Sequence, residues 1–251
     1  MTDISLQVEN GKIVAYDEQG NKVPLPAEAI ATEEVNNIRY PHPDDGAPGI
    51  QAAIDSLPQE GGLIYLRPGR YDIEDGSYNN IAIEVIDNQV DRLGIFGPPS
   101  ARIFLPDGIT ATGEGKQIIN IGDNEPGDVR PQDNVTLCGF TIDGNQQNQG
   151  SISGGADGHN IVVEGSNFMM YGVHSINSTG DGVEPERHGT DDTDGIWIIG
   201  NRFEDNYEHD VHLHGVKNAW VIGNRLEGNN AKEAISCADS GQDVENILIL
   251  G

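Results

Sequence analysis

Residues 195–203 read GlyIleTrpIleIleGlyAsnArgPhe, and residues 218–226 return the same pattern as AsnAlaTrpValIleGlyAsnArgLeu. Related stretches stand at 134–142, 160–168 and 246–251. Aligned on a shared glycine, they are 26, 35, 23 and 28 residues apart and give the series Gly139, Gly165, Gly200, Gly223 and Gly251. Short apolar runs that recur at this period, without long helical segments, predict an all-β right-handed parallel β-helix. The longest interval predicts a loop that projects from one turn.

The chain before these repeats is predicted to form two parts. Residues 47–57 carry apolar side chains at helical spacing, with Pro48 in the first turn, and indicate a helix that covers the open end of the solenoid. Residues 4–25 alternate around AsnGly at 10–11, which indicates a β-hairpin. We therefore divide the chain into an N-terminal hairpin adaptor and linker, 1–44, and a β-helix domain, 45–251.

The charge of the chain is strongly negative. It has 41 acidic and 14 basic residues, a net charge of −27 and an isoelectric point near 4.2. Recurrent apolar runs argue against acidic disorder, so we interpret the charge as a halophilic surface, with cation binding as the alternative. Nucleic acid is an unfavourable partner, because contact with phosphates needs basic patches.

Compartment and redox signals are few. We expect no membrane segment, and the N-terminus lacks the basic and apolar regions of a signal peptide. A virion surface, or secretion without a classical signal, fits these features. The two cysteines, Cys138 and Cys237, stand in apolar runs and are predicted to be buried free thiols.

The opening of the predicted solenoid resembles a known superfamily. GlnAlaAlaIleAsp at 51–55, GlyGly at 61–62 and ProGlyArgTyr at 68–71 are similar to the opening of pectate-lyase-like β-helix proteins. The same opening occurs in mannuronan epimerase catalytic modules and in many virus tailspike proteins. The resemblance covers about 200 residues and implies the fold and a carbohydrate ligand, but one fold hosts many activities.

Alternation along the later strands predicts one exposed patch. In 209–215, Val211 and Leu213 should point inward, which leaves Asp210, His212 and His214 outward. Aligning the apolar positions of three turns should stack Glu184, His212 and Ser236, with Glu186 beside His214, at about 4.8 Å per strand. In the third of these turns Ile235 and Cys237 should point inward.

This patch supplies the candidate site residues. The catalytic candidates are Asp181, Glu184, His209 and His212, and the ligand-binding candidates are Glu186, Asp210, His214, Arg187 and Tyr171. Carboxylates beside imidazoles suit acid–base chemistry on a glycosidic bond or a uronate C5 proton, but they also suit a divalent cation such as Ca²⁺ or a merely solvated acidic face. A second, weaker cation site is an acidic loop with Asp191, Asp192 and Asp194.

Aromatic side chains and asparagines add weaker candidates. Four ring-bearing residues could stack on sugars, although the two tryptophans could equally point into the core; the set is Tyr171, His174, Trp197 and Trp220. Asn201 and Asn224 follow the repeated glycine and are predicted to form a structural ladder.

Enzyme motifs of the resembled families are each incomplete. Polygalacturonase-like hydrolases carry GlyAspAsp and GlyHisGly on adjacent turns, whereas this chain has GlyAspGly at 180–182 and GluHisAsp at 208–210. Asp181 and His209 correspond to one Asp and the His, and Gly182 replaces the second Asp. Mannuronan epimerases carry GlyTyrGlyPheAspProHisGlu, and the matching stretch at 180–187 is GlyAspGlyValGluProGluArg. Glu184 therefore replaces Asp, and the His is displaced to His188.

These departures lead to the functional prediction. We expect a virion appendage, such as a tail-spike, fibre or decorating protein, that presents its β-helix to host-surface or acidic polysaccharide. It would contact other virion proteins through the N-terminal hairpin and form a homo-oligomer, with a trimer favoured. The alternative is a polysaccharide lyase, epimerase or glycoside hydrolase that uses the Glu184 and His212 patch.

Overall fold

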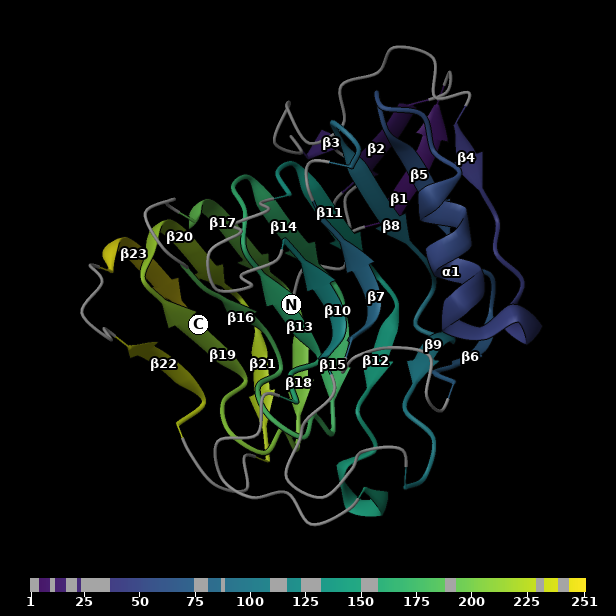
Figure 1. Ribbon diagram of the computed structural model, residues 1–251. Helices are drawn as coiled ribbons and strands as arrows, with labels where there is room; N and C mark the ends of the chain where they lie inside the picture. The colour runs from purple at the N-terminus through teal and green to yellow at the C-terminus, as the bar shows by residue number, and fades with distance from the viewer. Residues whose placement is uncertain are drawn as a thin grey trace.

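The chain folds as a parallel β-helix in the computed structural model (Figure 1). Side chains are described in residues 37–74, 81–86, 89–108, 117–122, 132–149, 158–187, 193–228, 233–238 and 244–251, apart from Ala238, and before residue 37 only three strands are described, by their backbone. Strands pair in parallel with the strand three positions away in the chain, as β11 pairs with both β8 and β14. Each turn therefore contributes one strand to each of three sheets, which confirms the predicted fold class.

The three sheets run along the solenoid. The long sheet contains β4 (Ile38–Arg39), β5 (Gly62–Tyr65), β8 (Leu93–Phe96), β11 (Val135–Cys138), β14 (Phe168–Tyr171), β17 (Thr193–Ile199), β20 (Val216–Ile222) and β23 (Glu245–Leu250). The second sheet contains β6 (Gly69–Asp72), β9 (Ala101–Phe104), β12 (Thr141–Asp143), β15 (His174–Ile176), β18 (Arg202–Glu204) and β21 (Arg225–Glu227). The third sheet contains β7 (Ile81–Val85), β10 (Gln117–Ile121), β13 (Ile161–Val163) and β16 (Glu184–Pro185), and isolated bridges join it to the pair β19 (Val211–His214) and β22 (Ile235–Ala238). One short 3-10 helix, η2 (Gln146–Asn148), follows β12.

The glycine series predicted from the sequence is wrong at one position. Cys138 pairs with Tyr171 in the long sheet, so the counterpart of Gly139 is Gly172 and not Gly165. The stretch 160–168 contains β13, which belongs to the third sheet. The projecting loop predicted between residues 165 and 200 includes 188–192, which lie outside the described residues. Gly139 and Gly172 have φ of 86° and 62°, a backbone region that favours glycine. Any short apolar strand before a glycine matches the pattern, and only the pairing register distinguishes the two sheets.

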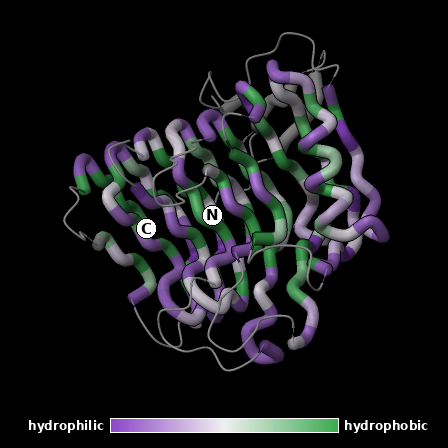
Figure 2. Tube along the Cα trace, viewed as in Figure 1, coloured by the Kyte–Doolittle hydropathy of each residue, from purple (hydrophilic) through white to green (hydrophobic). Residues whose placement is uncertain are grey.

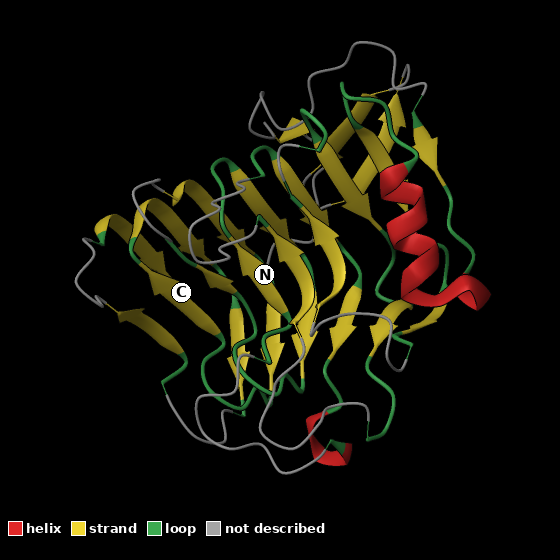
Figure 3. Cartoon of the chain, in the orientation of Figure 1, coloured by secondary structure: helices red, strands yellow, loops and turns green. Residues whose placement is uncertain are grey.

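A helix covers the first turn, as predicted. The 3-10 helix η1 (Pro43–Asp45) leads into α1 (Gly46–Asp55), which lies against β5, β6 and β7 (Figure 3). Ile50 and Ile54 on its inner face are fully buried. His42 accepts a hydrogen bond from the backbone N–H of Asp44 at 3.2 Å and so caps η1. Burying each isoleucine contributes about 1.5–3 kcal/mol, which explains how a ten-residue helix is held here.

The N-terminal strands form a separate antiparallel sheet. Here β1 (Ser5–Glu9) pairs with β2 (Lys12–Tyr16), and β2 pairs with β3 (Lys22–Val23). Glu9 lies opposite Lys12, so a two-residue connection joins the first two strands. This register agrees with the hairpin that the sequence predicts.

Inward side chains stack in rows from turn to turn. Hydrophobic residues line neighbouring strands (Figure 2), and one inward row of the third sheet runs from Ile83 through Ile119 and Ile161 to Val211. Phe203 lies fully buried beneath the second sheet. Since no turn buries its own apolar face alone, these rows make the solenoid one cooperative unit.

Asparagines bridge the turns, as predicted. Asn201 accepts a hydrogen bond from the N–H of Val173 and donates to the carbonyl of Met170. Asn224 repeats the pattern one turn later by donating to the carbonyl of Ile198. These amides satisfy backbone groups where the chain bends between sheets.

The two cysteines differ in burial, although both were predicted to be buried. Cys138 is buried, but Cys237 is exposed, because it stands on the last described strand of the third sheet and no further strand is described beyond it. Trp197 and Trp220 point outward and stack on each other, with ring centroids 5.0 Å apart and planes 5° apart. Among the described helices none is long and apolar enough to cross a membrane.

Candidate functional site

The third sheet brings the predicted site residues together. Val183 pairs with Val211, and His212 pairs with Ser236, so Glu184, His212 and Ser236 form the row that the sequence predicts. Glu186 pairs with His214, also as predicted. The register therefore agrees with the alternation argument in the strands themselves.

A second row lies beside the first and contains a residue that the sequence analysis missed. Asp181, His209 and Glu233 each stand two positions before an inward apolar residue of their turn. His159 stands two positions before Ile161 and so precedes Asp181 in the same row. That constant offset is the signal that could have identified His159.

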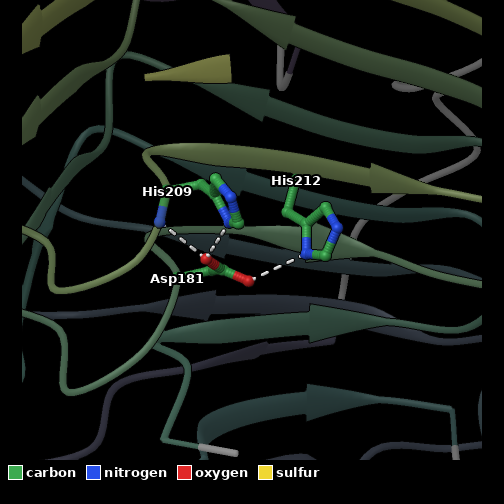
Figure 4. A group of neighbouring side chains, drawn as sticks. All are labelled: Asp181, His209 and His212. Carbon is green, nitrogen blue, oxygen red and sulfur yellow. Dashed lines mark hydrogen bonds and ion pairs between the residues drawn. The ribbon is translucent and has the colours of Figure 1, made fainter. Parts of the chain in front are cut away.

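Asp181 is the centre of the site. One carboxylate oxygen, Oδ1, accepts hydrogen bonds from the backbone N–H of His209 at 2.7 Å and from its ring Nδ1 at 2.8 Å. The other oxygen, Oδ2, lies 3.0 Å from Nδ1 of His212 (Figure 4). Burial alone would raise the pKa of Asp181, but the hydrogen bonds from His209 and His212 outweigh it and hold that pKa far below its usual range. The side chain is fully buried and ionised.

Glu184 is held between two imidazoles. Its Oε1 lies 2.9 Å from Nδ1 of His212, and its Oε2 lies 3.0 Å from Nε2 of His159. Burial opposes ionisation, but hydrogen bonds from His212 and His214 lower the pKa of Glu184 to about 2. Glu184 therefore carries a fixed negative charge on the outward row.

The backbone sets the tautomer of His159. The N–H of Asp181 donates to Nδ1 of His159 at 2.9 Å, so that nitrogen keeps its lone pair. The ring proton then lies on Nε2 and is donated to Glu184. His159 thus accepts from the backbone through Nδ1 and faces the Glu184 carboxylate through Nε2.

His212 is the described histidine that has a buried ring nitrogen without a hydrogen-bond partner. Burial lowers its pKa, but hydrogen bonds to Asp181 and Glu184 outweigh burial and raise it to about 10. Its Nδ1–H is shared between the two carboxylates. Its Nε2 is buried and has no hydrogen-bond partner within the described part of the chain. An unpaired buried ring nitrogen lowers the stability of the folded chain by about 1–3 kcal/mol. Such groups are found in ligand-binding and catalytic sites.

The patch is more enclosed than the sequence suggests. Glu184 and Glu186 retain 6% and 8% of their accessible surface, although both lie on outward rows. Asp210 was predicted to point outward, and this is wrong: it is fully buried and accepts a hydrogen bond from Asn206 at 2.8 Å. The reason is that β19 begins at Val211, so strand alternation does not extend back to Asp210.

The remaining candidates lie at varied distances from this cluster. Arg187 adjoins it, since its N–H donates to the carbonyl of His214. Tyr171 lies in the long sheet, on a different face of the solenoid from the cluster. Asp194 also belongs to the long sheet and accepts a hydrogen bond from Asn218 at 2.7 Å. Asp191, Asp192 and His188 fall outside the described residues.

The cluster also contains sets of potential metal ligands. Asp181 with His209 and His212, His159 with Asp181 and Glu184, and Glu184 with Glu186 and His214 each bring three ligand atoms within 4.8 Å of one another. Because these sets mix imidazole nitrogen with carboxylate oxygen, they suit a transition-metal ion better than the Ca²⁺ considered from the sequence, which prefers oxygen alone. An ion here would displace protons that the groups now share.

The incomplete hydrolase motif has a steric cause. A Cβ atom at Gly182 would lie 2.7 Å from the carbonyl oxygen of Asp210 and 2.8 Å from the ring of Phe203. An aspartate therefore cannot stand at this position without moving the adjacent turn. Asp181 and His209 are in contact, but the second Asp of the resembled motif has no room.

Comparison with known proteins defines the fold. No protein-family model and no curated protein matches the chain. A candidate glycosyl hydrolase from Parabacteroides merdae aligns with a TM-score of 0.58 at 14% identity, over 86% of this chain and 92% of the other. ORF18 of Geobacillus virus E2 aligns at 0.47 with 14% identity, over 96% of this chain and 54% of the other. The A-module of Azotobacter vinelandii mannuronan C-5 epimerase AlgE6 aligns at 0.42 with 20% identity, over 84% and 61%.

The chain thus spans little more than half the length of the last two structures. The likeness to the first, together with the three parallel sheets, establishes the class: an all-β parallel β-helix with the pectate-lyase-like fold. The superfamily resemblance drawn from residues 45–73 is confirmed at the level of fold.

Proposed function

We propose that this chain is a carbohydrate-active enzyme whose reaction takes place at the Asp181, Glu184 and His212 cluster. The observation that carries the proposal is the setting of His212. Its Nδ1 lies 3.0 Å from Oδ2 of Asp181 and 2.9 Å from Oε1 of Glu184, so the two carboxylates orient the ring. Its Nε2 has no hydrogen-bond partner among the described residues. A carboxylate-oriented imidazole of this kind serves as a proton donor or acceptor in many enzymes.

The substrate class follows from the fold and from the charge of His212. At neutral pH the two carboxylates keep His212 protonated, so Nε2 presents an N–H group. This group can donate its proton to the leaving oxygen of a glycosidic bond, or it can hydrogen-bond to the carboxylate of a uronate and withdraw charge from C5. Both reactions act on polysaccharides. A polyuronate contains both the glycosidic oxygen and the uronate carboxylate that His212 could contact.

Turnover tests the proposal directly. The protein is incubated in high salt with alginate and with polygalacturonate. Reducing ends without absorbance near 235 nm report a hydrolase, reducing ends with that absorbance report a lyase, and exchange of the C5 proton in D₂O without chain cleavage reports an epimerase. A His212→Gln variant should lose at least about 100-fold in rate, since positioned proton transfer contributes about 10²–10⁴. His174→Gln, on the second sheet, is the matched control and should retain activity. Equal rates in both variants would remove His212 from the mechanism.

A second function is favoured by one other observation. The antiparallel sheet β1–β3 lies outside the parallel solenoid topology and offers an attachment element ahead of the cap helix. On this basis the chain could be a virion appendage that binds host-surface glycan without turning it over. Glycan binding that survives in His212→Gln, with no turnover in either protein, would favour this function. A gene position among capsid and tail genes would favour it further.

A further inference from the structure

The outward face of the long sheet carries an apolar row along its whole length. The register places side chains from seven successive strands in one line, which includes Tyr65, Phe96, Tyr171, Ile199, Ile222 and Leu250. Cys138 occupies the one remaining position. Tyr40 extends the line beyond Tyr65, and a neighbouring outward line holds Leu63, Met169, Trp197, Trp220 and Leu248. We call these two lines the apolar strip.

The outward face of the second sheet is different in character. Its equivalent line holds Arg70, Arg102, Thr141, His174, Arg202 and Arg225. Four of these are arginines that pair with acidic side chains, such as Arg202 with Glu204 at 2.7 Å. The apolar strip is therefore a property of one sheet and not of the solenoid as a whole.

Exposure is concentrated on the same sheet. The described large hydrophobic side chains that are exposed include Tyr65 at 43%, Leu248 at 42% and Leu250 at 51%. Tyr40 follows β4 and has its ring 5.9 Å from that of Tyr65. Ile249 is also exposed, but it pairs with Val221 in the inward row and does not belong to the strip. A contiguous apolar patch on a chain with a net charge of −27 marks an interaction surface.

We propose that the apolar strip is a self-association surface that packs against the same strip of a second copy of this chain. Length favours this occupant. From Tyr40 to Leu250 the strip crosses seven strand spacings of about 4.8 Å, or about 34 Å. Its two lines lie about 7 Å apart along the strands, which with their side chains makes the strip about 15 Å wide. It then covers roughly 500 Å² per copy, so two strips bury about 1,000 Å², the lower limit for a specific interface.

Charge and ring geometry disfavour other occupants. Two copies with a net charge of −27 repel each other through charged faces, and the uncharged strip is where they can approach most closely. A polysaccharide would need exposed ring faces for stacking. The ring planes of Trp197 and Trp220 lie 5° apart with centroids at 5.0 Å, so each ring covers one face of the other. This arrangement suits a dry protein contact better than a sugar platform.

Sedimentation equilibrium and light scattering of the full chain in high salt test this inference, which is independent of the proposed function. The wild-type protein should show a mass of two or more chains, each of 27.0 kDa, at micromolar concentration. Association should tighten as salt rises, because salt screens the net charge and leaves the apolar contact. Ile199→Arg should weaken association by at least 100-fold.

A matched control and a milder variant make the result decisive. Ile176→Arg makes the same exchange at an outward position of the second sheet and should leave the mass unchanged. Tyr65→Arg alters a side chain that is already 43% exposed, so it tests the strip even if Ile199→Arg does not fold. A wild-type mass of one chain at every concentration would overturn the inference. So would an oligomer that persists in the folded Tyr65→Arg and Ile199→Arg variants.

Discussion

His212 should make the stability of the protein depend on pH above neutrality. Its pKa rises from 6.5 to about 10 in the folded chain, because Asp181 and Glu184 accept its Nδ1–H. The stabilisation is therefore complete below pH 6.5 and is lost as pH rises through 10. That difference in pKa corresponds to an upper bound of about 5 kcal/mol. Because the side chain retains some contact with solvent, we expect roughly 2–3 kcal/mol.

The assay is equilibrium unfolding by guanidinium chloride at constant ionic strength between pH 6 and 10.5. The quantity of interest is the free energy of unfolding of wild type minus that of His212→Gln. It should fall by roughly 2–3 kcal/mol across this range. His174→Gln is the control: burial lowers the pKa of His174, so its contribution changes only near and below its unfolded pKa of 6.5, and the difference should be flat above about pH 7.5. A His212→Gln difference that stays constant within about 0.5 kcal/mol would refute the assignment of Nδ1 as a shared proton donor.

Three further predictions follow from single side chains and are checked by the same unfolding assay. Asp181→Asn should cost about 3–5 kcal/mol, because it removes a fully buried charge from three imidazoles; a loss below 1 kcal/mol would contradict the contacts of Figure 4. Phe203→Ala should cost about 3–5 kcal/mol, since its ring is fully buried in the inward stack, and a cost like that of a surface change would show that the stack is loose. Gly223→Ala should cost about 1–2 kcal/mol through its φ of 61° alone, because nothing lies within 4 Å of the added Cβ, and Gly108→Ala, at φ 70° with equally open space, should cost the same.

Local patterns predicted much of the architecture. The spacing of Ile50 and Ile54 predicted the cap helix, and alternation in 211–214 predicted which side chains share the outward row. Both succeed because a helix or a strand repeats its geometry over its own length. The predicted asparagine ladder succeeds for the same reason, since Asn201 and Asn224 occupy the same position in adjacent turns.

Pairing between turns could not be read with the same success. Gly165 and Gly172 both follow apolar strands, and only the register shows that Gly172 belongs to the series. The prediction that Asp210 points outward is wrong for a related reason, because the sequence does not show where β19 begins. Turn lengths in the long sheet vary from 23 to 33 residues along Gly139, Gly172, Gly200 and Gly223, so no fixed offset recovers the stacking.

The sequence by itself determined that this chain is a solenoid of short strands with an acidic surface and a patch of carboxylates and imidazoles. Those features depend on local periodicity and composition. Tertiary structure decided how the patch is built: Asp181 lies beneath it, His159 joins from a turn earlier, and His212 keeps one ring nitrogen unpaired. It also decided that one of the three sheets carries an apolar outer face. Both results depend on which strands stack, and stacking is set by contacts between residues far apart in the chain.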